Sequence, residues 1–341
     1  MSKIFSRFRS TKVLVFPGQG RFDVISLSSL TKHQNVPLVQ SLLAQTDETL
    51  PTLRLSEFIT DPATALAQRD IQLTSIQQPL LILTSYITYH LLRAVKNENI
   101  LNDTDFLLGH SVGEICALVA QDSIAFVAGL ELAYKRGMLM EKLVKETGKA
   151  FSMQALLFQP THYKYITQIL EELDVQVSNY NNYQQLAVSG EKTELSQKID
   201  QLKARIAKAG VWKTRVHSID LGVNIPFHNP VLRPIEKELG QLFEKTVPVK
   251  RALGVPMVSN LNGEMVADVN TQVKNIVQVT SKPVQFLKCL ETLSSLDDEF
   301  EFISFGDTTS KIIQKYFQDA QKLKNLRAKC STRTVDDLLS A

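Results

Sequence analysis

Cysteine is scarce in this sequence, and the cysteines present do not pair. Cys116, Cys289 and Cys330 are widely spaced and include no C-x-x-C pair, so the sequence indicates neither a disulfide framework nor a zinc site. No apolar run approaches the ~18 residues that a membrane-spanning helix needs. The net charge of +3 is too small and too dispersed to indicate nucleic-acid binding. We therefore expect no metal, no membrane and no nucleic acid, and a reducing intracellular compartment.

What the sequence does contain is ample material for a core. Of its 341 residues, 44% are hydrophobic and 21% are charged, as is ordinary for a globular protein. The length predicts one large domain with a smaller companion.

The N-terminal segment has a different composition from the rest. It holds several basic residues and serines, and no acidic residue comes before Asp23. Apolar residues recur between the basic ones at helical spacing. This pattern predicts a mitochondrial presequence over residues 1–11 and a location in the mitochondrial matrix, and the alternative is a basic disordered tail on a cytoplasmic protein.

Residues 109–113 read Gly-His-Ser-Val-Gly, the G-x-S-x-G pattern of a nucleophilic serine on a sharp turn between a strand and a helix. An apolar run precedes the pattern, and an uninterrupted apolar stretch follows it. Glycines on both sides of Ser111 remove Cβ atoms where the strand and the helix nearly touch. The amide of Val112 falls at the helix N-terminus, where it can help to stabilise an oxyanion. The pattern predicts acyl transfer or ester hydrolysis, against the alternative of a serine that merely caps a helix.

Apolar runs alternate with helical patterns along the chain, which predicts an α/β fold. Strands are expected at residues 13–16 and 106–108. The main domain is expected to continue through residues 255–259, and a strand-to-turn segment at residues 302–306 leads into a C-terminal helix. Between about 150 and 212 the order is strand, helix, strand, strand, helix, and a strand near 214–216 closes it, which is the ferredoxin-like arrangement. We expect an α/β-hydrolase-like catalytic domain with a central, mostly parallel sheet over residues 12–147 and 213–341. A ferredoxin-like α+β small domain is expected over residues 148–212.

A serine nucleophile needs a base within hydrogen-bond reach, and six histidines are available. His228 lies between two prolines in a loop after a strand, and a histidine held so rigidly suits a general base. His217 is the second candidate, and Asp220 is the nearest acidic residue in sequence for orienting the ring. Each of these three also has a structural interpretation.

Arg136 lies on the helix that follows the nucleophile turn. An arginine on an amphipathic helix is usually a solvated surface residue, and the pattern alone favours that interpretation. The functional alternative is a guanidinium that binds a carboxylate at two points.

Six segments spread over nearly the whole chain belong together: residues 16–20 (FPGQG), 109–114 (GHSVGE), 136–140 (RGxxM), 179–181 (NYN), 226–228 (PFH) and 283–286 (PVQF). In their residues and in their order, these segments resemble the malonyl-CoA:acyl carrier protein transacylases of fatty acid synthesis.

The resemblance implies roles for individual residues. Ser111 would attack the malonyl thioester, and His228 would take the proton of its hydroxyl and later return it to the leaving thiol. The backbone amides of Gln19 and Val112 would form the oxyanion hole. Arg136 would pair with the free malonyl carboxylate. An acetyl group has no such carboxylate and would leave the buried guanidinium unpaired, which explains discrimination against acetyl groups.

Three further residues enter through the resemblance. A backbone carbonyl near the glutamine motif, here Gln285, would orient the histidine in place of an aspartate, which weakens the case for Asp220. Asn181 and Phe227 would belong to the substrate site. Val112 and Phe227 are also similar to the residues of malonyl-selective members.

The implied reaction moves the malonyl group from malonyl-CoA to the phosphopantetheine thiol of acyl carrier protein through a malonyl-serine intermediate. No metal or bound cofactor is needed, because the pantetheine arm belongs to the substrates. The expected partners are a coenzyme A thioester and acyl carrier protein, and the chain is expected to act as a monomer in type II (mitochondrial) fatty acid synthesis. Basic residues assigned to the C-terminal helix are either a docking face for the acidic carrier or an ordinary solvated face. They are Lys311, Lys315, Lys322, Lys324, Arg327 and Lys329.

The sequence departs from the family at two places. Arg21 stands where small polar residues are usual, and Gly306-Asp307-Thr308 replaces the Gly-Pro-Gly common near the end. Two other functions stay open. A serine esterase or thioesterase would pass the acyl group to water, and Arg136 and the small domain argue against it. A carrier-binding module without activity would need no nucleophile, base or carboxylate-binding arginine.

Overall fold

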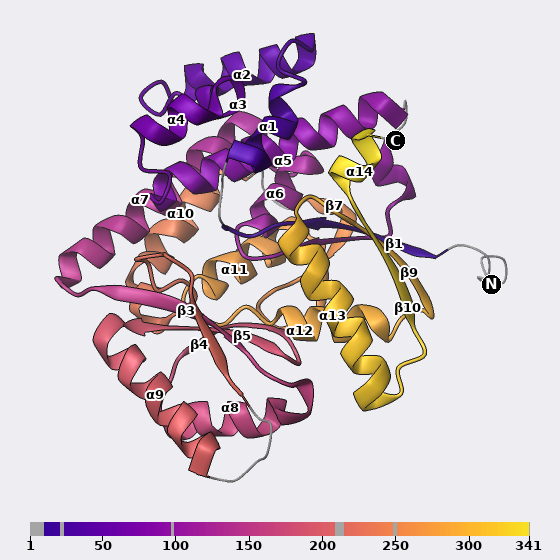
Figure 1. The fold of residues 1–341 in the computed structure, drawn as a ribbon. Helices are drawn as coiled ribbons and strands as arrows, with labels where there is room; N and C mark the ends of the chain where they lie inside the picture. Colours follow the sequence, from indigo (N-terminus) through magenta and orange to yellow (C-terminus); the bar gives the residue numbers. More distant parts are fainter. Residues whose placement is uncertain (1–9, 21–23, 97–98, 209–214, 248–250, 341) are drawn as a thin grey trace.

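The chain folds around two β-sheets of different size (Figure 1). In the computed structural model, the described residues are 10–20, 24–96, 99–208, 215–247 and 251–340. The larger sheet has six strands in the order β10-β9-β1-β2-β7-β8, and the smaller has four in the order β4-β5-β3-β6. None of the described helices is long and apolar enough to cross a membrane.

The six-stranded sheet is parallel except at one edge, where β8 runs antiparallel to β7. The inner strand β1 lies between β2 and β9, so Leu14 pairs with Leu107 on one side and with Ile303 on the other. Such apolar runs are typical of parallel strands that are covered on both faces. The strands are β1 (Thr11–Phe16), β2 (Phe106–Gly109), β7 (Ala252–Val258), β8 (Met265–Asp268), β9 (Glu299–Ser304) and β10 (Lys329–Thr334).

Alternation along β1 divides the core into two layers. Val13 and Val15 face one side of the sheet, Leu14 and Phe16 face the other, and all four are fully buried. Helices therefore cover both faces of a mostly parallel sheet, which confirms the predicted α/β class. The Val13 side is covered by α12 (Phe286–Ser294) and α13 (Asp307–Lys324). The Leu14 side is covered by α5 (Thr74–Lys96), α6 (Gly113–Ala120), α7 (Phe126–Thr147), α10 (Glu236–Thr246), α11 (Val269–Val279) and α14 (Val335–Ser340).

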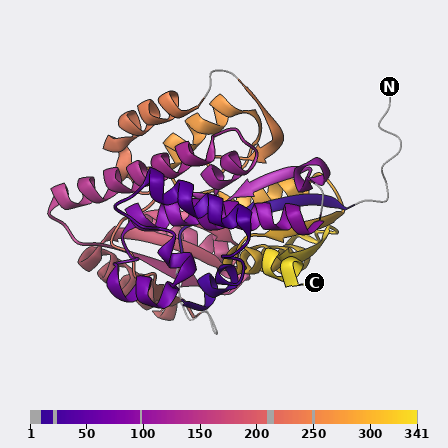
Figure 2. The ribbon, with the colours of Figure 1, turned by 90° about the horizontal axis from the view of Figure 1, so that it is seen from above.

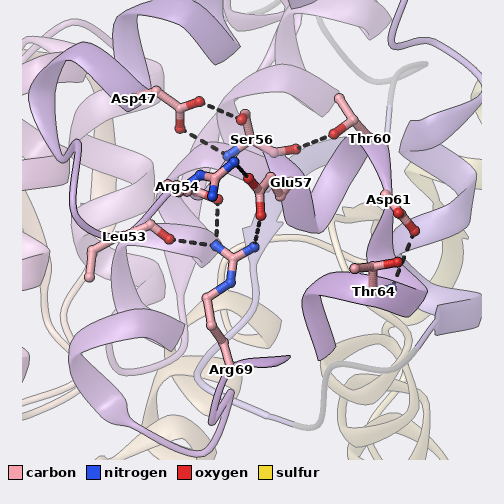
Figure 3. Close-up of polar contacts among 9 residues, drawn as sticks. All are labelled: Asp47, Leu53, Arg54, Ser56, Glu57, Thr60, Asp61, Thr64 and Arg69. Atoms are coloured by element: carbon pink, nitrogen blue, oxygen red, sulfur yellow. Dashed lines mark hydrogen bonds and ion pairs between the residues drawn. The ribbon is translucent and has the colours of Figure 1, made fainter. Parts of the chain in front are cut away.

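Four short helices near the N-terminus form an outer layer over α5 and α7 (Figure 1). Polar contacts hold their connecting loops. Glu57 accepts from both Arg54 and Arg69, and Arg69 also donates to the carbonyl oxygens of Leu53 and Arg54, each at 2.7 Å (Figure 3). The guanidinium of Arg69 lies 4.7 Å from the ring centre of Phe58. The four helices are α1 (Val24–Thr31), α2 (Pro37–Thr49), α3 (Glu57–Thr60) and α4 (Pro62–Gln68), and a 3₁₀ turn (Ile100–Asp103) follows α5.

The two long helices α5 and α7 pack closely against each other, and a glycine permits it. A Cβ atom on Gly137 would lie 2.5 Å from the Cα of Ser75, so a larger residue would force the helices apart. This approach brings the start of α5 beside Arg136. α7 ends at Thr147, and the residue that follows it, Gly148, has a left-handed φ of 63° that suits glycine.

The smaller sheet is built in the order strand, helix, strand, strand, helix, strand, and all its strand pairs are antiparallel. This order agrees with the ferredoxin-like prediction. Its elements are β3 (Phe151–Leu157), α8 (Tyr163–Glu172), β4 (Val177–Asn182), β5 (Gln185–Glu191), α9 (Lys192–Lys208) and β6 (His217–Asp220), with a 3₁₀ turn (Pro160–His162) before α8.

Two strands differ from the prediction. The closing strand of the small sheet, β6, lies at His217–Asp220 rather than near 214–216, so the small sheet reaches past the expected boundary at residue 212. The strand expected at 302–306 is followed by another, β10, at Lys329–Thr334. Because α13 ends at Lys324, Arg327 and Lys329 do not belong to that helix.

The small subdomain is attached to the larger one by backbone hydrogen bonds. The amide of Tyr180 donates to the carbonyl of Val284 at 2.9 Å, and the amide of Val284 donates to Ser178 at 2.8 Å. The side chain of Asn182 donates to the carbonyl of Ile312 at 3.1 Å. The two sheets therefore meet through β4, close to the start of α12. Seen from above, α10 and α14 lie on opposite sides of the molecule (Figure 2).

Candidate active site

Ser111 stands on the sharp turn between β2 and α6. Its backbone is left-handed, with a φ of 56°, a conformation that costs a residue other than glycine on the order of 1–3 kcal/mol. The turn is tight because glycines bring backbones into contact. A Cβ atom on Gly109 would collide with Glu114, and one on Gly113 would collide with Phe16. The turn thus has the geometry of a nucleophile elbow.

His228 faces Ser111 directly. Its Nε2 atom lies 2.7 Å from Oγ of Ser111, and its Nδ1 atom lies 2.6 Å from the carbonyl oxygen of Val279. A carbonyl can only accept, so Nδ1 carries the hydrogen and Nε2 accepts from the serine hydroxyl. This is the tautomer that a general base needs. The carbonyl that orients the ring is that of Val279, a short distance before Gln285 in the sequence, and not that of Gln285 itself.

Burial keeps the imidazole neutral. Only 2% of the surface of His228 is exposed, and burial lowers its pKa to about 3, with a further contribution from the charge of Arg136. The hydrogen bond to Val279 opposes this shift. At neutral pH the ring is therefore unprotonated and able to accept a proton from Ser111.

Arg136 is buried, with only 3% of its surface exposed, so the interpretation as a solvated surface residue is wrong. Its Nη1 atom donates to Oε1 of Gln78 at 2.7 Å, whereas its Nε atom is buried without a hydrogen-bond partner among the described residues. Burial lowers the pKa of Arg136 to about 10, and the carboxyl of Glu114 opposes the shift. The guanidinium stays cationic at neutral pH, and a buried cation with an unpaired N–H favours the binding of an anion.

A short chain of hydrogen bonds connects Arg136 to the loop after β1. Nε2 of Gln78 donates to Oγ1 of Thr74 at 3.1 Å, and the hydroxyl of Thr74 donates to Oε1 of Gln19 at 2.6 Å. Nε2 of Gln19 is buried without a partner in the part of the chain that the structure describes. Val112 precedes the first turn of α6, so no carbonyl of the helix accepts from its amide. The side chain of Gln19 is thus held by Thr74, and Val112 directly follows Ser111 at the N-terminus of α6.

A second group of polar side chains lies beneath the turn, and sequence reasoning did not single it out. Asn260, at the end of β7, accepts from the amide of Ser111 and donates to the carbonyl of Gly109, each at 2.7 Å. Glu114 accepts from the amide of Asn260 at 2.9 Å and from the side chain of Gln272 at 2.7 Å. Asn260, Glu114 and Gln272 are fully buried, and burial raises the pKa of Glu114 to about 7.

The remaining residues from the resemblance surround this centre. Oδ1 of Asn181 lies 2.9 Å from Nε2 of His110, so it holds the residue before the nucleophile. Phe227 packs against a small cluster that includes Met140 of α7. The amide of Gln285 donates to the carbonyl of Asn260 at 2.7 Å, which places Gln285 one contact away from the turn.

Other candidates lie elsewhere. His217 and Asp220 are exposed on the edge strand β6, and the carboxylate of Asp220 accepts from the amide of Gly222 at 2.7 Å. Asp307 begins α13 after Gly306. Arg21 and residues 1–9 lie outside the described residues. Among the described residues, no three histidine, cysteine or carboxylate side chains gather as a metal site.

The fold and the paired serine and histidine define an α/β protein whose serine is placed to accept an acyl group. Residues 29–325 match the model of the acyl transferase domain. The chain therefore belongs to the acyl transferase domain family.

Individual relatives agree with this assignment. The chain is 28% identical over 314 residues to a malonyl CoA-acyl carrier protein transacylase of Staphylococcus aureus, covering 92% of this chain and 94% of that protein. It is 28% identical to one of Bacillus subtilis over 281 residues, covering 82% and 81%. Its fold is similar to that of the malonyl-CoA:acyl carrier protein transacylase of Helicobacter pylori, with a TM-score of 0.77, 20% identity and 97% of each chain covered. The structure from Mycobacterium tuberculosis has a TM-score of 0.73 and 23% identity, with 96% of this chain and 99% of that chain covered.

Proposed function

We propose that this acyltransferase moves the malonyl group from malonyl-CoA to the phosphopantetheine thiol of acyl carrier protein through a malonyl ester of Ser111. The observation that carries the proposal is the 2.7 Å contact between Oγ of Ser111 and Nε2 of a neutral, oriented His228. The names of the sequence relatives support the choice of substrates.

The first half-reaction acylates the serine. Oγ of Ser111 attacks the thioester carbonyl carbon while Nε2 of His228 takes the hydroxyl proton. The negative charge that develops on the carbonyl oxygen is stabilised by the backbone amides of Gln19 and Val112. When the C–S bond breaks, the imidazolium returns the proton to the sulfur of coenzyme A. In the second half-reaction Nε2 of His228 takes the proton of the carrier thiol as its sulfur attacks the ester carbonyl carbon. When the C–O bond of the ester breaks, the imidazolium returns this proton to Oγ of Ser111.

Arg136 selects the acyl group in this proposal. The free carboxylate of a malonyl group would accept from its guanidinium, whose Nε atom otherwise has no partner among the described residues. An acetyl group would leave that buried donor unpaired, at a cost of about 1–3 kcal/mol or more because the group is charged. The chain of Thr74 and Gln78 fixes the guanidinium relative to Gln19.

The test is the intact mass of the protein after brief mixing with malonyl-CoA or acetyl-CoA. Wild type should gain a malonyl-sized adduct that is absent in Ser111→Ala and disappears when holo carrier protein is added. Arg136→Ala should lose the preference for malonyl, whereas Lys135→Ala, which changes the exposed neighbour on the same helix, should keep it. An adduct that disappears in buffer alone would identify a hydrolase, and no adduct with either thioester would refute the acyl transfer.

We propose further that the protein works in mitochondria. The support is the run of basic residues and serines without an acidic residue before Asp23. Residues 1–20 fused to a fluorescent reporter should direct it to mitochondria, and replacing Lys3, Arg7 and Arg9 by glutamate should abolish this. A reporter that stays diffuse would leave a basic tail as the explanation.

A further inference from the structure

Among the described residues, Asn260 alone has a side chain that is hydrogen-bonded to the backbone of both Gly109 and Ser111, one on each side of His110. Its Oδ1 atom accepts from the amide of Ser111 and its Nδ2 atom donates to the carbonyl of Gly109, both at 2.7 Å. We propose that Asn260 is a positioning residue that holds the backbone of Ser111 in the left-handed conformation from which Oγ meets His228. The proposal rests on the proposed acylation of Ser111.

The turn needs such support from outside itself. A left-handed Ser111 stores on the order of 1–3 kcal/mol of strain, which only the surrounding structure can maintain. The two contacts act on opposite sides of His110, so together they fix the end of β2 and the amide of the nucleophile. Relaxation of the turn would move Oγ away from Nε2 of His228, now 2.7 Å distant, and an error of 1 Å in such a contact lowers rates about 10²-fold.

Asn260 is itself held in place, which makes it suitable for this role. Its side chain is fully buried, and the two backbone partners assign its oxygen and nitrogen without ambiguity. Its own amide donates to Glu114 at 2.9 Å, and its carbonyl accepts from the amide of Gln285 at 2.7 Å. Glu114 on α6 and Gln285, the residue before α12, therefore both fix the position of Asn260.

Asn182 provides a matched control. It is also buried, its Oδ1 atom accepts from the amide of Gln184 at 3.0 Å and its Nδ2 atom donates to the carbonyl of Ile312 at 3.1 Å. It therefore makes the same two kinds of hydrogen bond away from the nucleophile turn. Its partners, Gln184 and Ile312, also differ from His110, the residue that Asn181 contacts beside the nucleophile.

The experiment measures the rate at which a small fluorophosphonate labels Ser111, because this probe needs neither the malonyl group nor the carrier. Asn260→Ala should be labelled about 10²-fold more slowly than wild type, while Asn182→Ala keeps the wild-type rate. Thermal unfolding of both variants measures the structural loss. Labelling of Asn260→Ala at the wild-type rate, or equal slowing in both variants, would overturn the proposal. Failure of the malonyl transfer with normal labelling would overturn only the proposed function.

A second variant, Asn260→Asp, covers the case in which Asn260→Ala does not fold. The carboxyl group of this variant can accept from Ser111 and donate to Gly109 while it is protonated, but its ionised form has no hydrogen to donate. The titratable side chains that contact Asn260 are Glu114 and Cys289, so wild type is measured over the same pH range. Labelling of the variant relative to wild type should rise as the pH falls from 8 to 5. A constant ratio would show that the contact with Gly109 is not needed.

Discussion

Glu114 offers a quantitative test of the buried polar group beneath the nucleophile. Its carboxyl is fully buried, and burial raises its pKa from 4.5 to about 7 in spite of hydrogen bonds from Asn260 and Gln272 and the charge of Arg136. The folded protein therefore holds a proton on Glu114 at pH values where the unfolded chain has released it. Between pH 4.5 and 7 the folded state binds more protons, so the free energy of unfolding falls as the pH rises.

The magnitude follows from the two pKa values. A shift from 4.5 to about 7, at 1.36 kcal/mol per unit, corresponds to a loss of about 3 kcal/mol that is complete above pH 7 and absent below pH 4.5. Glu114→Gln has no proton to lose. Its free energy of unfolding, relative to wild type, should therefore increase by about 3 kcal/mol between pH 4.5 and pH 8.

Urea unfolding at a series of pH values provides the assay. The amide of the variant places an N–H where Oε2 of Glu114 has no partner among the described residues, which lowers stability equally at every pH. Only the change with pH of the difference in unfolding free energy therefore reports the proton of Glu114. Glu131→Gln, which changes a carboxylate on α7 that pairs with Lys135, is the control for replacing a glutamate by glutamine. A constant difference between Glu114→Gln and wild type would refute the argument.

Three other predictions concern the site and its supports, and the last compares two variants. His228→Ala should slow malonyl-adduct formation about 10²–10⁴-fold, as followed by rapid-quench mass measurements, and a rate within threefold of wild type would exclude it as the base. Gln78→Leu removes the partner of Arg136 Nη1 and should raise the KM for malonyl-CoA more than it lowers kcat, and an effect on kcat alone would contradict a binding role. Gly137→Ala should lower stability by about 1–3 kcal/mol through overpacking, because its Cβ would approach Ser75. Gly240→Ala, in an open helical position, should instead gain about 0.5–1 kcal/mol, and thermal unfolding that ranks the two the other way would refute this.

The sequence predicts the parts of the fold that have a strong local pattern. The apolar runs of β1 and β2 and the glycines around Ser111 mark a buried strand, a sharp turn and a helix, because few other structures accommodate those residues. β10 lacks such a signal: it is a polar edge strand in which exposed and half-buried residues alternate. β6 is also a mostly exposed edge strand, so its position depends on pairing with β3 rather than on its own residues.

The site was predictable where a side chain performs the chemistry and less so where the backbone or a supporting residue does. Val279 contributes only its carbonyl to His228, and a carbonyl leaves no mark on the residue type. Asn260 follows β7 without a recognisable motif around it, and only the fold brings its side chain to Gly109 and Ser111. The burial of Arg136 likewise depends on the close approach of α5, which no pattern on α7 reveals.

The supporting residues beneath the site are polar, although apolar residues in the same positions would often give a protein at least as stable. Gln78, Glu114, Asn260 and Gln272 are at most 1% exposed and all take part in hydrogen bonds, yet each loses solvation on folding, and a buried polar network is often no more stable than an apolar core. Their partners are the arginine, the backbone of the nucleophile turn and one another. What these contacts add is a fixed orientation, because each hydrogen bond has a preferred geometry. The pH-dependent loss of stability at Glu114 would therefore measure what burial of these polar groups costs. The slower labelling of Asn260→Ala would measure what the same buried groups contribute to the placement of Ser111.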